Sequence, residues 1–143
     1  MIMGRDIRIM EFLKRCAIDN PGTKNNFKLA AALVLKRDII SLGYNQMRTH
    51  PLQSQFSKNN HAIYLHAEIN AIASALNHID KKELRKASLY VARVKRSGPD
   101  ADDWVDGLAC PCSGCASAIL AFGISRVIHT TDSNENYEER YYV

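Results

Sequence analysis

Two short stretches decide how this chain folds: His66-Ala67-Glu68 and, further along, Pro111-Cys112-Ser113-Gly114-Cys115. One imidazole and two thiolates form a ligand set that favours Zn²⁺, and a tetrahedral ion held by three protein groups keeps its fourth position for water. The sequence therefore predicts one catalytic zinc site, with His66, Cys112 and Cys115 as its ligands.

Both stretches are expected to open a helix. Residues two apart within a helix point to different sides, so His66 and Glu68 can serve one site only if the helix begins there. Cys112 and Cys115 span a first helical turn, and Pro111 suits a helix start because it has no N–H to lose. The positive end of a helix dipole lowers the pKa of a thiol, which favours bonding to zinc. Two helix N-termini are therefore predicted to face one metal.

Glu68 is the residue that would make such a site catalytic. Zinc brings the pKa of its water toward neutrality, and a neighbouring carboxylate can take that proton and return it to a leaving group. Cys-x-x-Cys alone also suits a redox pair or a structural zinc, and Cys110 is an alternative fourth ligand that would close the site. Because Cys110 precedes Pro111 and lies outside the helical turn, we expect an open site with three protein ligands.

The two motifs together, H-x-E followed by P-C-x-x-C, resemble the signature of the cytidine and deoxycytidylate deaminase superfamily. The likeness extends to Ile39–Asn45, which is similar to the family's second strand and Gly-x-Asn turn, and to Arg126–Ile128, which is similar to the strand after the second zinc helix. It spans roughly residues 5 to 131. The Gly43–Asn45 turn and His66–Ile72 look most like the deoxycytidylate deaminases, including those of phages.

This resemblance implies an α/β fold, a three-layer α/β/α sandwich with a central mixed sheet, and zinc-dependent hydrolytic deamination. Glu68 would deprotonate the zinc-bound water, which attacks carbon 4 of a cytosine ring, and would pass the proton to ring nitrogen 3 and then to the departing amine. Deoxycytidylate (dCMP) is the expected substrate; free cytidine, cytosine or another nucleobase are alternatives. The family pattern does not use Cys110 as a ligand.

Two interpretations from other classes stay open. A deaminase of RNA or single-stranded DNA would need a basic groove with stacking aromatic residues. Four aspartates near the second motif argue against a phosphate backbone there: Asp100, Asp102, Asp103 and Asp106. In a non-catalytic zinc module, Glu68 would have no function.

Five residues are candidates for substrate contacts. The resemblance implies that Asn45 contacts the sugar or base, although asparagine at a strand end is also a common turn former. It further implies that the backbone amide of Ala67 donates to the pyrimidine carbonyl. Arg48 and Lys58, in the long loop before the first motif, either bind a 5′-phosphate or are merely solvated. Trp104 either stacks on the base or anchors its loop in the core.

A second, structural zinc is a further hypothesis. Some deoxycytidylate deaminases build one from a first-helix cysteine and loop histidines, and Cys16, His50 and His61 are those residue types in those regions. The simpler interpretation is a buried helix cysteine and two ordinary loop histidines.

The whole chain, 1–143, is expected to form one domain. A helix is predicted from Arg5 to about Asp19, followed by a hairpin of strands at Lys28–Leu35 and Ile39–Tyr44, with a helix through Leu29–Leu35 as the alternative. Residues 45–65 show no clear period and predict a substrate-covering loop, as against a surface excursion with some local helix.

Further elements complete the predicted sheet. We expect a strand at Ala87–Val94, a loop at Lys95–Ala109, a helix from Cys112 to about Phe122 and a strand at Arg126–Thr130. Tyrosines 137, 141 and 142 either pack over the pocket or belong to a fraying tail. This order predicts a sheet covered on both faces.

Charge and apolar content indicate the partners and the compartment. The net charge is +4 with scattered positive residues, which fits a phosphorylated small-molecule substrate better than a nucleic acid. The longest apolar run, Leu29–Leu35, is too short to span a membrane, and no leader segment opens the chain. We therefore expect a cytoplasmic protein with reduced cysteines and no nucleic-acid or membrane partner. We also expect it to form a homo-oligomer.

Overall fold

Within residues 1–23, 27–57, 64–98 and 103–143, which the computed structural model describes, six strands form one sheet. These are β1 (Phe27–Leu35), β2 (Asp38–Tyr44), β3 (Ser88–Arg96), β4 (Trp104–Gly107), β5 (Arg126–Thr130) and β6 (Tyr137–Tyr141). The strand order is β2-β1-β3-β5-β6, and β4 pairs with the part of β3 that extends beyond β5. β3 and β5 run parallel and the other neighbours run antiparallel, so the sheet is mixed, as predicted.

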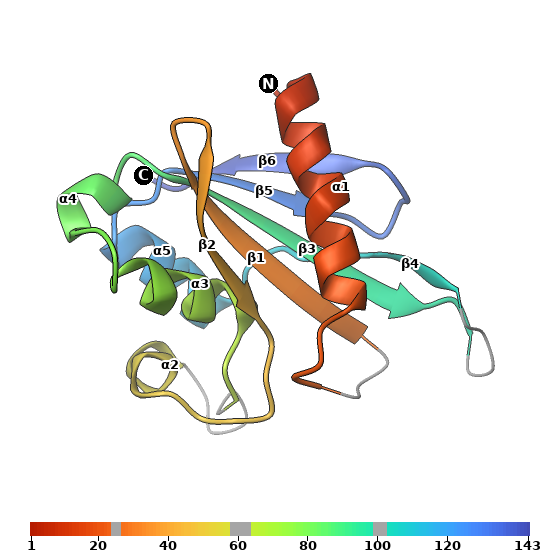
Figure 1. The fold of residues 1–143 in the computed structure, drawn as a ribbon, viewed down its shortest axis with the longest axis horizontal. Coiled ribbons are helices and arrows are strands. Elements are labelled where there is room, and N and C mark those ends of the chain that lie inside the picture. Colours follow the sequence, from red (N-terminus) through yellow and green to blue (C-terminus); the bar gives the residue numbers. More distant parts are fainter. Residues whose placement is uncertain (24–26, 58–63, 99–102) are drawn as a thin grey trace.

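Helices cover both faces of this sheet (Figure 1). On one face α1 (Gly4–Ile18) packs against β1 and β3. The other face carries α2 (Pro51–Phe56), α3 (Ala67–Ala75), α4 (Lys81–Leu84) and α5 (Ser113–Ala121). The predicted three-layer α/β/α sandwich is therefore confirmed.

Alternation along the central strands divides the core into two parts, because successive side chains of a strand point to opposite faces. The α1-side core includes Met10, Leu13, Ala17, Ala30, Ala32, Tyr90, Ala92 and Ile128. The α3/α5-side core includes Ala31, Leu33, Ile69, Ile72, Leu89, Val91, Ile119 and Val127. Residues 29–35 lie in strand β1, where residues 30–34 are buried on both faces, so the alternative of a helix there is wrong.

Glycine lets two elements approach each other closely on the α3/α5 side. A Cβ added at Gly43 in β2 would overlap the backbone of α3 at Ala71 N and Ala67 O. A Cβ added at Gly114 would lie 2.7 Å from the carbonyl oxygen of Phe56 at the end of α2. Contacts this short do not occur between real atoms of these kinds, so both positions require glycine as the elements are now packed.

Three segments differ from the sequence-based prediction. Residues 45–65 contain α2, which agrees with the alternative of an excursion with local helix, and residues 58–63 lie outside the described part. The predicted loop at Lys95–Ala109 is wrong in part, because β3 continues to Arg96 and forms a hairpin with β4. The fraying tail is also wrong, because residues 137–141 form the edge strand β6.

Long-range polar contacts explain why the tail is ordered. Arg126 Nε donates to Glu139 Oε2 at 2.5 Å, and the Tyr137 hydroxyl donates to Glu11 Oε1 at 2.6 Å. Across the described ranges, none of the helices is both long and apolar enough to cross a bilayer.

Candidate active site

A histidine and two cysteines from separate parts of the chain meet between α3 and α5. His66 is the N-cap of α3, with extended backbone (φ −83°, ψ 153°), and Cys112 is the N-cap of α5 (φ −68°, ψ 171°). Cys115 lies in the first turn of α5 and is fully buried. Both helices therefore begin at the motifs, as the spacing predicted.

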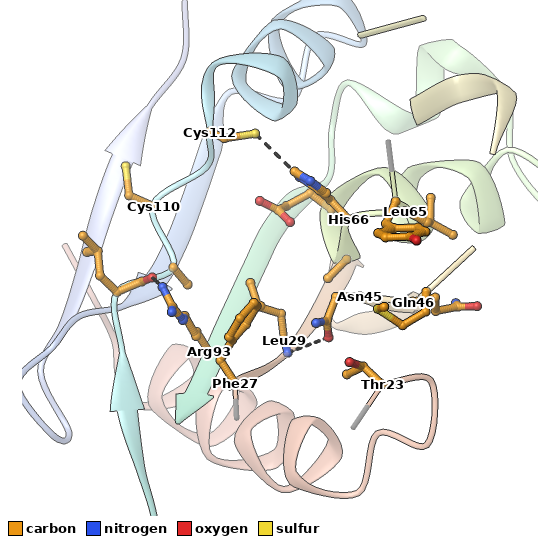
Figure 2. A pocket seen from close by; sticks show the side chains of 16 residues that line it. Thr23, Phe27, Leu29, Asn45, Gln46, Leu65, His66, Arg93, Cys110 and Cys112 are labelled. Carbon is orange, nitrogen blue, oxygen red and sulfur yellow. Dashed lines mark hydrogen bonds between the residues drawn. The ribbon is translucent and has the colours of Figure 1, made fainter. Parts of the chain in front are cut away.

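The ligand atoms of these three residues lie within 4.8 Å of one another. His66 Nδ1 is 3.3 Å from Cys115 Sγ and 3.6 Å from Cys112 Sγ (Figure 2). In the part of the chain that the structure describes, this is the only cluster of three or more His, Cys, Asp or Glu side chains suited to a metal ion. Cys110 lines the neighbouring cavity but does not belong to the cluster.

The charges of this cluster suit a divalent zinc ion. Hydrogen bonds with Cys115 and His66 lower the pKa of the Cys112 thiol to about 3, so that side chain is a thiolate at neutral pH. The contact with Cys112 in turn raises the pKa of Cys115 and of His66. The imidazole and the two sulfur atoms compete for one proton. Zinc would displace that proton and bind all three atoms.

Glu68 is the second residue of α3, two positions after His66, and its side chain is buried, with 4% exposure. Burial raises the pKa of its carboxyl group, because the charged form loses hydration. A carboxyl group that holds a proton more readily than an exposed glutamate is suited to act as a general acid and base.

A cavity of about 380 Å³ adjoins the cluster. Its lining includes His66, Ala67, Glu68 and Cys112, together with residues of β1, β3 and the segments that follow β2 and β4. Figure 2 shows His66 and Cys112 at one end of the cavity and Phe27 and Arg93 at the other. The predicted contact residues Asn45 and Ala67 both line this cavity. Ala67 is the first residue of α3, so its N–H has no acceptor within the helix.

Two donors fix the orientation of the Asn45 side chain. Its Oδ1 accepts the Leu29 N–H at 2.9 Å and the Asn20 Nδ2–H at 2.8 Å. Asn20 is itself buried, with 1% exposure, and its Nδ2 also donates to the Asn45 carbonyl at 3.0 Å. Because both contacts use the oxygen of the Asn45 amide, its NH₂ group is the part available to donate into the cavity.

The short helix α2 braces both helix N-termini. Gln53 is buried, with 1% exposure, and its Oε1 accepts the backbone N–H of His66 at 2.9 Å. The end of α2 packs against α5 at Gly114, between the two cysteines. α2 thus holds the two halves of the cluster together.

The other predicted contact residues are not brought to the cavity. Arg48 lies in a separate groove between α2 and α3, where its Nε donates to Gln46 Oε1 at 2.6 Å. Trp104 packs against the α1-side core, with Lys28 and Arg96 over its ring, so it anchors its loop. Lys58 lies outside the described residues.

The proposed second metal site is not assembled by the described residues. Cys16 belongs to α1, on one face of the sheet. His50 caps α2, on the other face, by accepting the Leu52 N–H at 3.0 Å. His61 falls outside the described residues. The structure therefore supports the interpretation of Cys16 and His50 as an ordinary helix cysteine and an ordinary capping histidine.

Three residues near the site were missed by the sequence prediction: Asn20, Gln53 and Arg93. Arg93 alone had a signal, because it follows Leu89 and Val91 on the inward face of a strand, where an apolar residue is expected. The other two act through hydrogen bonds to distant residues, and neither has a local pattern that marks it.

Comparison with known proteins places these features in a family. The model of the cytidine and deoxycytidylate deaminase zinc-binding region matches residues 3–131. None of the curated proteins matches the chain. Among solved structures, the chain is similar to the cytidine deaminase from Burkholderia pseudomallei, with 19% sequence identity, a TM-score of 0.62, and coverage of 94% of this chain and 91% of that chain.

A second similar structure is the dCMP deaminase from the cyanophage S-TIM5 in complex with dCMP and dUMP. It has 20% sequence identity and a TM-score of 0.48, and the match covers 85% of this chain and 74% of that chain. The likeness to the Burkholderia structure shows the shared fold, and the match over residues 3–131 shows the family. The chain therefore belongs to the cytidine and deoxycytidylate deaminase family and is a zinc-dependent hydrolytic deaminase.

Proposed function

We propose that the chain converts dCMP to dUMP with release of ammonia, using Glu68 as the proton shuttle and His66, Cys112 and Cys115 as the zinc ligands. The observation that carries this proposal is the placement of the buried Glu68 carboxyl group beside the three-residue cluster, at the end of a cavity that Ala67 and Asn45 also line.

Zinc, Glu68 and the attacking water have separate roles in the proposed reaction. When bound, zinc supplies a Lewis acid that lowers the pKa of water. Glu68 takes a proton from the attacking water and delivers it to ring nitrogen 3, and it then delivers the second proton of that water to the amine leaving carbon 4. The water oxygen becomes the new carbonyl oxygen, so the products are a uracil ring and ammonia. Because burial raises the pKa of Glu68, its carboxyl group can hold the proton between these two transfers.

Two groups in the cavity wall would orient the substrate. The Ala67 N–H, at the positive end of α3, suits the pyrimidine carbonyl oxygen. The Asn45 NH₂ group, fixed by Leu29 and Asn20, suits an acceptor oxygen of the sugar or base. A preorganised donor adds more to binding than a freely rotating one, because its orientation is already restricted.

An ammonia-release panel tests the proposal. The zinc-loaded protein is incubated with dCMP, cytidylate, deoxycytidine, cytidine, cytosine, guanine and a structured RNA. We expect the highest kcat/KM with dCMP. Faster release from a free nucleoside, a free base or RNA would assign that substrate instead, and no release from any of them would contradict the reaction itself.

A further inference from the structure

Arg93 lines the active-site cavity from the floor of the sheet. Alternation along β3 places it after Leu89 and Val91, on the face that carries the α3/α5-side core. It pairs across the strands with Leu29 of β1, and its guanidinium carbon lies 4.9 Å from the centre of the Phe27 ring. Figure 2 shows Arg93 and Phe27 across the cavity from His66 and Cys112. A charged side chain thus stands at the end of the cavity opposite the reacting groups.

The guanidinium of Arg93 is only weakly engaged by the protein. Nη1 donates to the Leu108 carbonyl at 3.4 Å, a long contact. Nε is buried and has no hydrogen-bond partner. No ion pair found among the described residues includes Arg93. The protein therefore supplies few hydrogen bonds to this guanidinium, and a ligand oxygen that met the part of it lining the cavity would add one.

The neighbouring carboxylate is already occupied. Asp132 accepts Lys95 Nζ at 3.0 Å and the Leu108 N–H at 3.0 Å. The opposite charges of Asp132 and Arg93 attract each other, but the two side chains do not form a close ion pair. Glu68 is the acidic residue of the described cavity lining, and it stands at the cluster end. Arg93 therefore keeps its positive charge available to an anion.

The β3–β4 hairpin leaves room for this side chain. Arg93 is paired with Gly107, and a Cβ at Gly107 would lie 3.2 Å from both Cγ and Cδ of Arg93. Any larger residue there would push the arginine stem away. The absence of a side chain at position 107 thus lets the arginine lie along the cavity wall.

We propose that Arg93 binds the 5′-phosphate of the substrate and so selects nucleotides over nucleosides. This inference rests on the proposed function, in which carbon 4 of the ring lies at the cluster and the sugar extends away from it. The guanidinium fork matches phosphate oxygens in geometry and charge, and within the described lining Arg93 is the only arginine or lysine. Arg48, the earlier candidate, faces the other groove.

Steady-state kinetics on zinc-loaded protein test this assignment. For Arg93→Gln we expect kcat/KM on dCMP to fall roughly 10- to 100-fold, mostly through KM, because a charge-assisted contact to phosphate is lost. On deoxycytidine the same variant should stay within about threefold of wild type, since the phosphate contact is absent there. The matched control, Arg48→Gln, should change neither value. Arg93→Lys should restore only part of the dCMP preference, because lysine keeps the charge and loses the fork.

Equal losses on dCMP and deoxycytidine would overturn the proposal, since Arg93 would then support the segment around Leu108 and not bind phosphate. A direct binding experiment separates this result from a failure of the proposed reaction. Calorimetry compares dUMP with deoxyuridine, and inorganic phosphate serves as a competitor, with no turnover required. Tighter binding of dUMP to wild type that disappears in Arg93→Gln would support the phosphate site even if dCMP is not deaminated. Equal binding of dUMP and deoxyuridine by wild type would overturn it, whether or not the variants fold.

Discussion

Gln53 is buried on α2, and its Oε1 accepts the backbone N–H of His66, the N-cap of α3, at 2.9 Å. This bond fixes the residue that begins α3 and carries the imidazole of the metal cluster. Replacing a residue that hydrogen-bonds to a metal ligand and orients it typically changes the metal affinity.

Gln53→Ala is therefore expected to weaken zinc binding by roughly 10- to 100-fold, the range seen for residues that orient metal ligands. The matched control is Gln55→Ala, which removes an exposed glutamine from the same short helix. Competition with a zinc chelator measures both affinities. Equal affinity in the two variants would mean that the bond does not orient His66.

Cys112→Ala and Cys115→Ala should each lose zinc and activity together, and both should unfold at lower temperature, because metal binding contributes to folding. Cys110→Ser should keep its zinc and most of its activity, since Cys110 is not part of the three-residue cluster. Metal analysis and thermal melts of the three variants measure these effects. Zinc loss in Cys110→Ser would indicate a closed site with four ligands.

Glu68→Ala should keep its zinc content, because the cluster of His66, Cys112 and Cys115 does not use the carboxyl group. Its deamination rate should fall by about 10²- to 10⁴-fold or more, the typical contribution of a general acid–base residue. The readouts are metal analysis and single-turnover ammonia release. A variant that retained more than about a tenth of the wild-type rate would not fit a shuttle role for Glu68.

Gly43→Ala should destabilise the fold, because the added Cβ would overlap the backbone of α3 at Ala67 and Ala71. Overpacking of this kind costs about 1–3 kcal/mol, and here it also pushes α3 away from the sheet. Gly98→Ala is the control, since a Cβ at that position would meet nothing within 4 Å. Urea unfolding of both variants gives the comparison, and similar unfolding free energies would show that α3 can shift without cost.

The lowered pKa of Asp6 predicts how the free energy of unfolding changes in acid. Burial raises the pKa of its carboxyl group, but hydrogen bonds from Arg126 and Tyr90 outweigh that effect and bring the pKa to about 2, against an ordinary value of 3.8. The unfolded chain therefore binds this proton more readily than the folded chain. The stabilisation by Asp6 is present above about pH 4 and is lost as the pH falls toward 2.

Asp6→Asn should lower the free energy of unfolding at neutral pH by about 2 kcal/mol, and this deficit should shrink between about pH 4 and 2. Asp38→Asn, at an exposed aspartate, is the control. Urea titrations at several pH values measure both. A deficit that stayed constant down to pH 2 would show that the Asp6 charge is not responsible.

The metal cluster could be predicted from the sequence because its rules are local. A proline before Cys112 and the three-residue step to Cys115 fix a helix start wherever the helix lies, and the same holds for His66 and Glu68. That helices cover both faces of the sheet followed from the order of the predicted strands and helices along the chain. These features depend on neighbours in the chain, which a sequence displays directly.

The rest depends on partners that are distant in the sequence. Trp104 packs against the α1-side core, where it contacts Lys28, and no local sequence pattern indicates that distant contact. The strand β6 is rich in charge and shows little apolar alternation, and it is held by the pair of Arg126 with Glu139. Arg93 became a candidate only when the cavity showed what lies around it.

The position of the cluster between two helix N-termini also links metal binding to the folding equilibrium. His66 and Cys112 are 46 positions apart, and β3, β4 and α4 lie between them. Closing a loop of this length costs chain entropy, and pairing of the central strands reduces that cost because it already brings the two helix N-termini together. The assembled sheet therefore presents the imidazole and the two thiols as one site, whereas an unfolded chain presents them as separated ligands. Zinc would thereby bind the folded chain in preference to the unfolded chain and shift the folding equilibrium toward it.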